Sequence, residues 1–182
     1  MTKDKSIFIK NIYYMLSYAF QVLNEQGYKN IATEQFNNTA ELMAAILEKG
    51  IAIQLKRGLG KEYIPQTEAL SSLRGKIDIA ESIKTQSTLR KQLICTYDEF
   101  SVNSIMNRII KSTVELLLRS NISKQRKKNL RKLMVYFSEV DFIDLYTVNW
   151  NVQYNRNNQT YRMLISICYL VVKGLLQTQS NG

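Results

Sequence analysis

The stretch KEYIPQTEALSSLRGKIDIAESIKTQSTLRKQLICTYD, residues 61–98, decides the fold because it interrupts the helical periodicity found on both sides of it. Its apolar runs are short, and it contains Pro65, the only proline of the chain. Residues 63–70 are expected to be extended, with Pro65 in an edge strand, because proline cannot donate a hydrogen bond to a ladder. Residues 93–98 alternate in the manner of a strand. We therefore predict a small β-containing module around residues 61–98.

Elsewhere in the chain, apolar residues recur at positions i, i+3, i+4 and i+7, which is the pattern of helices with a buried face. The sequence therefore predicts an α+β fold, mainly helical, in a single region of residues 1–182. It divides this region into a helical segment over residues 1–60, the module over residues 61–98 and a second helical segment over residues 101–176. Before the module, one predicted helix is capped by Asn11 and ends before Gly27, and a second covers residues 39–57 and is ended by Gly58. Within the module, a short helix over residues 77–85 follows a turn at Arg74 and Gly75. After the module, the predicted helices are one from Ser101 or Ser104 to about Asn121, one capped by Ser123, and one over residues 160–176.

The chain contains no histidine, and this absence excludes several classes of mechanism. Hydrolases with an imidazole base, His-ligated zinc sites and His-based nucleases all need that side chain. Cys95 and Cys168 form no CxxC motif and are expected to be buried free thiols. The N-terminus lacks the apolar run of a secretory signal, and no apolar stretch reaches the roughly 20 residues of a membrane span. We therefore expect a cytoplasmic protein without a membrane partner.

The net charge of +10 is concentrated in one region of the chain. Residues 1–100 hold 13 basic and 11 acidic side chains, whereas residues 101–132, a predicted helical hairpin, hold nine basic and one acidic. Such a surface attracts the phosphate backbone of nucleic acids. The alternatives are a solvated helix surface or a contact with an acidic protein. The predicted DNA-binding residues are Lys124, Arg126, Lys127, Lys128, Arg131 and Lys132.

No catalytic motif is found in the sequence. Metal-dependent nucleases without histidine commonly use an acidic residue, one spacer and a lysine, since carboxylates hold Mg²⁺ and the lysine positions the attacking water. None of the 15 acidic residues is followed two positions later by lysine. Two acidic pairs, Asp78 with Glu81 and Asp98 with Glu99, are interpreted as caps or solvated charges. We therefore predict no catalytic residues and no metal ligands in this chain.

Several motifs together resemble a known family. The segment NIYYMLSYAF, residues 11–20, is similar to the opening helix of McrC, the partner subunit of the McrBC 5-methylcytosine-dependent restriction system. Further motifs occur in the order and approximate spacing of that family. They are KRGL at residues 56–59, LRGKID at 73–78 with Ile83 after it, NRIIKST at 107–113, and Tyr161-Arg162. The resemblance covers nearly the whole chain.

The resemblance implies a subunit that binds a hexameric GTP-dependent AAA+ motor and stimulates its nucleotide hydrolysis in a defence complex that restricts methylated DNA. The family also carries a PD-(D/E)xK nuclease in the C-terminal half of a longer protein, and the present sequence ends before it. The expected subunit therefore has no activity alone and needs no cofactor itself, while Mg²⁺ and GTP are implied for the full complex. DNA is expected to be contacted through the complex.

By the same resemblance, the module at 61–98 is the candidate element to enter the pore of the motor, with Arg74, Lys76 and Asp78 as its partner-binding residues. The structural interpretation of LRGKID is that Gly75 permits a tight turn and Ile77 enters the core. Two other functions stay open at the level of sequence. One is a stand-alone basic DNA-binding module, and the other is a non-functional remnant that retains only its core.

Overall fold

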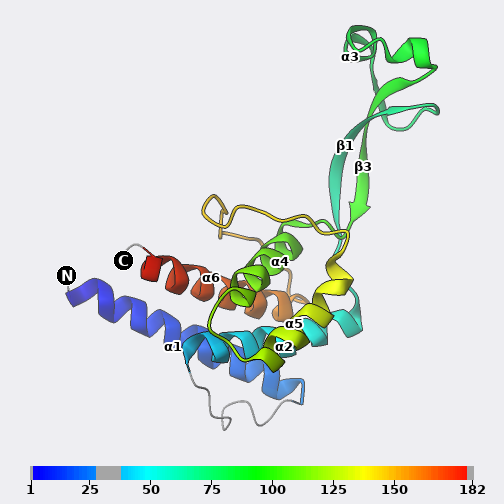
Figure 1. The fold of residues 1–182 in the computed structure, drawn as a ribbon. Helices are drawn as coiled ribbons and strands as arrows, with labels where there is room; N and C mark the ends of the chain where they lie inside the picture. Colours follow the sequence, from blue (N-terminus) through cyan, green and yellow to red (C-terminus); the bar gives the residue numbers. More distant parts are fainter. Residues whose placement is uncertain (1, 28–37, 180–182) are drawn as a thin grey trace. The chain divides into compact units, whose positions relative to one another are not determined.

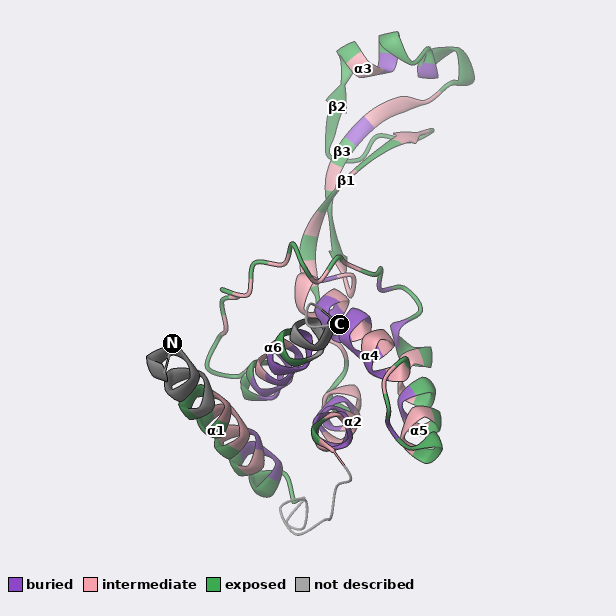
Figure 2. Ribbon diagram, turned by 60° about the vertical axis from the view of Figure 1, so that its left-hand side comes forward, coloured by how far each residue is buried: buried purple, intermediate pink, exposed green. Residues whose placement is uncertain are grey.

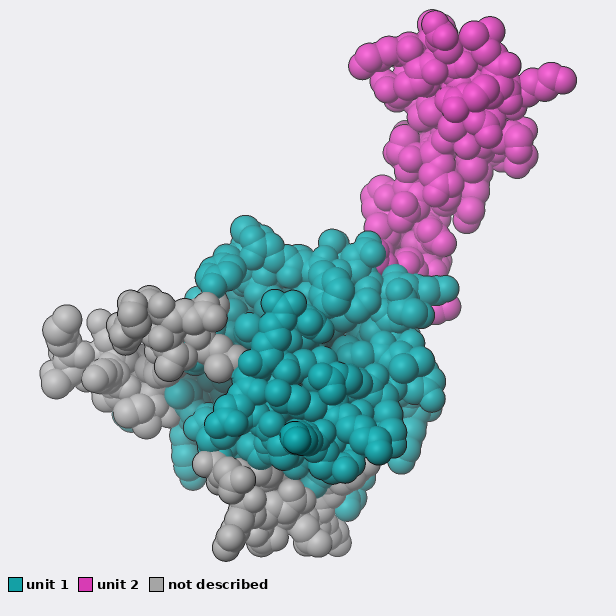
Figure 3. Space-filling model, viewed as in Figure 1, with its two compact units in different colours: residues 1–59, 105–182 teal, residues 60–104 magenta. Residues whose placement is uncertain are grey.

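A computed structural model describes residues 2–27 and 38–179 of the protein (Figure 1). It confirms the predicted α+β class, since helices predominate and three strands form a single antiparallel sheet. The chain divides into two compact units (Figure 3). We call residues 1–59 with 105–182 the helical unit, and residues 60–104 the β unit.

The helical unit is built around its last helix. Its elements are α1 (Thr2–Glu25), α2 (Thr39–Arg57), α4 (Ile105–Leu118), α5 (Lys124–Met134), the 3-10 turn η3 (Val135–Phe137) and α6 (Gln159–Gln179). Helix α6 packs against α1, α2 and α4, and buried residues line α2, α4 and α6 (Figure 2). Met163, Ile167 and Cys168 of α6 are completely buried. None of the helices within the described residues is long and apolar enough to cross a lipid bilayer.

Most helix ends lie where the sequence places them. The Ser123 hydroxyl accepts a hydrogen bond from the Arg126 amide, which confirms Ser123 as the cap of α5. Gly58, with φ of +91°, ends α2 as predicted. Of the two predicted starts for α4, the later one is correct, because α4 begins directly after Ser104 whereas Ser101 is the last residue of a strand.

The predicted start of the first helix at Asn11 is wrong. Helix α1 already begins at Thr2, and Asn11 lies exposed within it. The preceding residues contain neither proline nor glycine, so nothing stops the helix from continuing toward the N-terminus. An exposed Asn inside a helix costs only about 0.7 kcal/mol relative to alanine, and the neighbouring turns outweigh this small preference.

The β unit is an antiparallel ladder with a compact tip at one end. Strand β1 (Glu62–Leu70) pairs with β3 (Leu93–Ser101) over nine residue pairs, from Glu62 opposite Ser101 to Leu70 opposite Leu93. Strand β2 (Lys76–Asp78) pairs with the other side of β3, which gives the order β1-β3-β2. Strand β1 with Pro65 is therefore an edge strand, as predicted.

The tip of the β unit consists of β2, α3 (Ile79–Lys84) and the 3-10 turn η2 (Ser87–Arg90). Helix α3 begins two residues later than predicted because residues 76–78 are held in the sheet by β3. The buried hydroxyl of Ser82 donates to the Asp78 carbonyl oxygen at 2.6 Å and accepts from the Ile94 amide at 2.7 Å. The buried Ser87 hydroxyl donates to the Ser82 carbonyl oxygen.

Apolar burial contributes little to the β unit. Cys95 is its one fully enclosed apolar side chain, and the other buried side chains are those of Ser82, Ser87 and Ser104. The unit is therefore held by its backbone ladder and by hydroxyl hydrogen bonds rather than by a hydrophobic core. Several of its aliphatic side chains are exposed as a result, while Ile64, Leu70, Leu93 and Ile94 are half-buried.

Candidate functional site

The tip of the β unit and the segment between β1 and β2 expose large aliphatic side chains, which we together call the aliphatic tip. Single exposed apolar residues are common, but a group of them in one small unit is typical of a protein-binding surface. Their exposed fractions range from 39% to 79%. The members are Leu73, Ile77, Ile79, Ile83 and Leu89.

The three predicted partner-binding residues lie in the same region of the β unit, on and just before β2. The guanidinium carbon of Arg74 lies 3.9 Å from the centre of the Tyr97 ring, a cation–π contact that orients its side chain. Lys76 is exposed on β2. The Asp78 carboxylate accepts a hydrogen bond from the Glu81 amide at 2.9 Å and so caps α3. Asp78 therefore has a structural role, and Lys76 is the residue of this set that presents an exposed charge without such a role.

The sequence interpretation of Ile77 as a core residue is wrong. Its side chain is 39% exposed, since the β unit has too few residues to enclose it. Sequence reasoning missed the aliphatic tip for the same reason, because it assigns large aliphatic residues to a core. In the sequence, only the short apolar runs of residues 61–98 indicated that this module would have a small hydrophobic core.

Gly75 occupies the predicted turn and no other residue fits there. Its φ is +64°, and a β-carbon would overlap the carbonyl oxygen of Thr96 and lie 2.8 Å from Cβ of Tyr97. The close approach lets β2 pair with β3 and brings Arg74 over Tyr97. Gly75 thus sets the geometry of the tip.

The second predicted site lies on α5, and its Arg126 faces inward. The Arg126 guanidinium contacts Glu41 at 3.1 Å and Glu48 at 2.6 Å, both on α2, and its side chain is only 18% exposed. The Asn129 amide donates to Glu48 at 2.9 Å. Arg126 therefore joins α5 to α2, and unlike the predicted DNA-binding residues around it, its charge is already paired with two carboxylates.

Glu41 is the centre of this junction. Its carboxylate accepts hydrogen bonds from the Ser123 amide at 2.8 Å and the Ser123 hydroxyl at 3.0 Å, in addition to the contact with Arg126. Burial raises the pKa of Glu41, but the hydrogen bonds from Ser123 and Arg126 outweigh burial and hold the pKa below its ordinary value. Glu41 is thus ionised and fully occupied by groups of its own chain.

The remaining cations of residues 101–132 fall into two sets. Three of them are bonded within the helical unit. Arg108 donates to the Phe142 carbonyl oxygen, Lys111 to those of Phe137 and Val140, and Arg119 pairs with Glu115. The cations of the other set all lie on α5, so only one of the two helices of the predicted basic hairpin carries them. These residues are Lys124, Lys127, Lys128, Arg131 and Lys132, all exposed except the half-buried Lys127.

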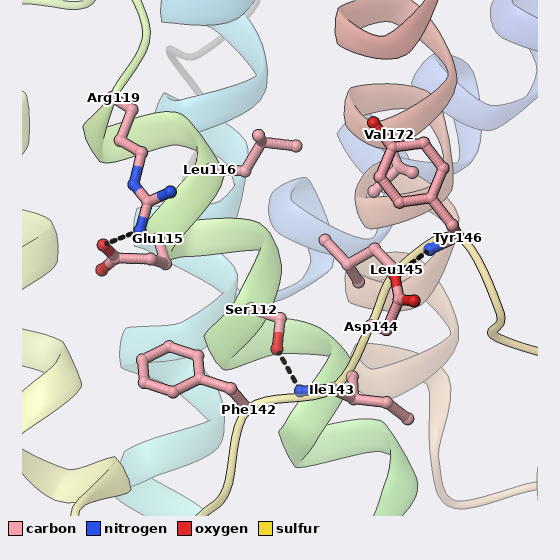
Figure 4. Close-up of a pocket in the computed structure, with 10 residues that line it drawn as sticks. All are labelled: Ser112, Glu115, Leu116, Arg119, Phe142, Ile143, Asp144, Leu145, Tyr146 and Val172. Atoms are coloured by element: carbon pink, nitrogen blue, oxygen red, sulfur yellow. Dashed lines mark hydrogen bonds and ion pairs between the residues drawn. The ribbon is translucent and has the colours of Figure 1, made fainter.

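A cavity of about 320 Å³ lies between α4, residues 142–146 and α6 (Figure 4). Its polar groups are already bonded to one another: Arg119 pairs with Glu115, Ser112 accepts from the Ile143 amide, and Asp144 accepts from the Tyr146 amide (Figure 4). The rest of its lining is mainly apolar. We find no catalytic arrangement in this cavity.

The two acidic pairs considered in the sequence lie in the β unit, and Asp98 and Glu99 are both exposed on β3. Asp78 caps α3, and Glu81 lies 3.9 Å from Lys84 on the surface. Among residues 2–27 and 38–179, no three His, Cys, Asp or Glu side chains gather where they could hold a metal ion.

The motifs at 107–113 and 161–162 mainly build the helical unit. The Tyr161 hydroxyl donates to Oδ1 of the buried Asn107 at 2.7 Å and joins α6 to α4. Arg162 lies over the ring of Tyr18, 5.3 Å from its centre, and so connects α6 with α1. These residues therefore join α6 to its neighbours α4 and α1.

Comparison with known proteins gives a consistent result. Residues 3–182 match the family model described as "McrBC 5-methylcytosine restriction system component". The chain is 27% identical over 176 residues to the type IV methyl-directed restriction enzyme EcoKMcrBC of Escherichia coli (strain K12), which covers 96% of this chain and 51% of that protein. The chain thus spans about half the length of this relative.

Two solved structures share the fold. One is a chain of the Thermococcus gammatolerans McrBC complex, with a TM-score of 0.62 and 21% identity over 88% of this chain and 50% of that one. The other is a chain of a half-complex from a tetradecameric assembly of Thermococcus gammatolerans McrB AAA+ hexamers with bound McrC. It has a TM-score of 0.59 and 22% identity over 86% of this chain and 41% of that one.

Proposed function

This chain belongs to the family of McrBC 5-methylcytosine restriction system components, and from this premise we propose that it is the McrC-like subunit that binds the AAA+ motor of a DNA restriction complex. Support comes from the fold, which is similar to chains of assemblies in which McrC is bound to McrB AAA+ hexamers. As the resemblance implies, binding stimulates GTP hydrolysis by the motor. The subunit acts through this contact and not through chemistry of its own.

The aliphatic tip is the observation that carries this proposal. Full burial of a Leu or Ile side chain is worth about 1.5–3 kcal/mol, so a partner that covers several of these side chains gains a large favourable term. The β unit cannot cover them itself, because its interior encloses only Cys95 among apolar residues. We propose that the motor covers the aliphatic tip, and that Lys76 adds an ionic contact beside it.

This proposal assigns no DNA cleavage to residues of this chain. The sequence lacks an acidic-x-Lys motif. Of its two acidic pairs, Asp78 and Glu81 serve the local structure of α3, and Asp98 and Glu99 are exposed on β3. The subunit alone is therefore expected to leave methylated DNA uncut with Mg²⁺ present.

The test uses the purified chain and its cognate AAA+ GTPase, with GTP hydrolysis followed against subunit concentration. The variant I79N/I83N removes two aliphatic side chains that are 68% and 66% exposed on α3. The matched control V135N/Y136N changes two side chains of the helical unit that are 71% and 67% exposed. We expect the tip variant to need at least about tenfold more subunit for the same stimulation, since two buried aliphatic contacts exceed about 1.4 kcal/mol.

A second tip variant, L73N/L89N, lies outside α3 and guards against a local effect on that short helix. It should lose stimulation as I79N/I83N does, while V135N/Y136N behaves as the wild type. Wild-type stimulation by both tip variants would overturn the assignment of the aliphatic tip. Failure of the wild-type chain to bind or stimulate the motor over a broad concentration range would overturn the proposed function itself.

A further inference from the structure

The outward side of α5 presents three cations in a line, which we call the basic stripe: Lys124, Lys128 and Arg131. They recur at i, i+4 and i+7, so at 3.6 residues per turn they lie within an arc of about 60°. All three are exposed. Lys127 and Lys132 flank the stripe on either side, and α5 contains no acidic residue.

The opposite side of α5 is fixed to the helical unit. Leu130 is completely buried, and Arg126 and Asn129 bond to Glu48. Glu41 and Glu48, the acidic residues that contact this helix, are thereby occupied on the inward side. The basic stripe is therefore held on a rigid helix, and its charges are not neutralised by neighbouring carboxylates of the described chain.

The composition of the stripe favours a nucleic acid over a protein partner. Protein interfaces are depleted in lysine at their centre and need apolar anchors. Helix α5 itself, residues 124–134, has no large exposed apolar side chain, and the exposed Val135 and Tyr136 lie beyond its end in η3. Lysine is a flexible point charge suited to phosphate oxygens. The stripe extends over about 10 Å of helix axis, which matches about three phosphates at roughly 3.4 Å per phosphate along one strand.

We infer that the basic stripe of α5 binds the phosphate backbone of double-stranded DNA without reading its sequence. The contact belongs to the helical unit and is independent of motor binding through the β unit. Through this contact the subunit binds DNA directly. The binding does not depend on which base modification other components of a complex recognise. Because the stripe contains no aromatic side chain on which a base could stack, duplex DNA is preferred over a single strand.

The experiment measures fluorescence anisotropy of a labelled, unmethylated duplex of about 30 base pairs with the purified chain alone, across a series of NaCl concentrations. The stripe variant is K124Q/K128Q/R131Q. The matched control K56Q/K84Q/K91Q removes the same number of charges at exposed lysines on α2 and in the β unit. Far-UV circular dichroism and thermal unfolding establish that both variants are folded.

We expect the stripe variant to bind at least about tenfold more weakly at low salt, with a slope of log K against log salt that is less steep by about 3, since each phosphate contact contributes about 0.9. The control should keep the wild-type slope. Equal losses in the two variants would reduce the effect to net charge and overturn the proposal. Competition by poly-aspartate as strong as by duplex of equal charge would assign the stripe to an acidic protein, and tighter binding of a single strand would overturn the duplex preference.

Discussion

Nε of Arg126 lies 3.1 Å from Oε1 of Glu41, although 85 positions separate the two residues in the chain. The contact connects the start of α5 to the start of α2, and Ser123 completes it from the α5 cap. In the sequence, Arg126 looks like one more cation of a basic surface. In the structure, its ion pair with Glu41 holds the helix that carries this surface against α2. The distinction between Arg126 and its neighbours can be measured.

Replacement of Arg126 by alanine should destabilise the protein by about 2–3 kcal/mol, a value reduced from that of a fully buried pair because the side chain is 18% exposed. The cause is that Glu41 is left buried without its cation. Urea unfolding followed by circular dichroism measures the change, and K128A, on the solvent side of the same helix, should stay within about 0.5 kcal/mol of the wild type. Equal effects of the two substitutions would contradict the assigned roles.

The junction also predicts a dependence of stability on pH. Because the folded state lowers the pKa of Glu41 below its ordinary value of 4.5, the unfolded chain takes up the proton first as the pH falls. The contribution of Glu41 is therefore complete well above pH 4.5 and is lost as the pH falls through 4.5 and the folded-state pKa. The difference in unfolding free energy between wild type and E41Q should shrink between about pH 6 and pH 3, and a constant difference would be inconsistent with an ionised Glu41.

Gly75→Ala should disrupt the tip of the β unit. Alanine at positive φ costs about 1–2 kcal/mol, and the overlap with the Thr96 carbonyl oxygen adds to it. Gly27→Ala is the matched control, since Gly27 also has positive φ but no atom within 4 Å of the added carbon. Amide hydrogen exchange should accelerate at β2 and at residues 94–96 only in the Gly75 variant. Unchanged protection there would show that the turn tolerates a side chain.

Both cysteines should be unreactive in the native protein. Burial raises the pKa of Cys168 to about 12, so almost no thiolate is present near neutral pH, and Cys95 is fully enclosed in the β unit. With Ellman's reagent we expect two thiols to react promptly in guanidinium chloride and neither promptly in buffer. If one thiol reacts quickly in buffer, a C95S variant shows whether the β unit opens.

The sequence was sufficient for features that depend on local chemistry. Ser123 as a cap, Gly58 as a helix end, Pro65 in an edge strand and Gly75 in a turn each follow from the properties of one residue type. The prediction for the start of α1 was wrong because a capping preference is worth only about 1 kcal/mol. The hydrogen bonds of the additional helical turns outweigh it.

The two candidate surfaces needed the structure for a different reason. Arg126 and Glu48 are 78 positions apart, so no local pattern indicates that Arg126 faces inward while Lys128 faces outward. Ile79 and Ile83 have the residue types of a core, and only the small interior of the β unit makes them a surface. Periodicity in the sequence predicts which residues share one face of a helix. Whether that face is buried depends on the size of the core against which the helix can pack.

The first pair of the β1–β3 ladder, Glu62 opposite Ser101, brings the two ends of the β unit together at one place in the chain. The β unit is therefore an insertion into the helical unit, and the two ends of this insertion are adjacent. Because its two ends are paired, we expect the length of this insertion to change with little effect on the residues that build the helical core. The motor contact that we propose for the aliphatic tip and the core of the helical unit thus lie in separate units of one chain.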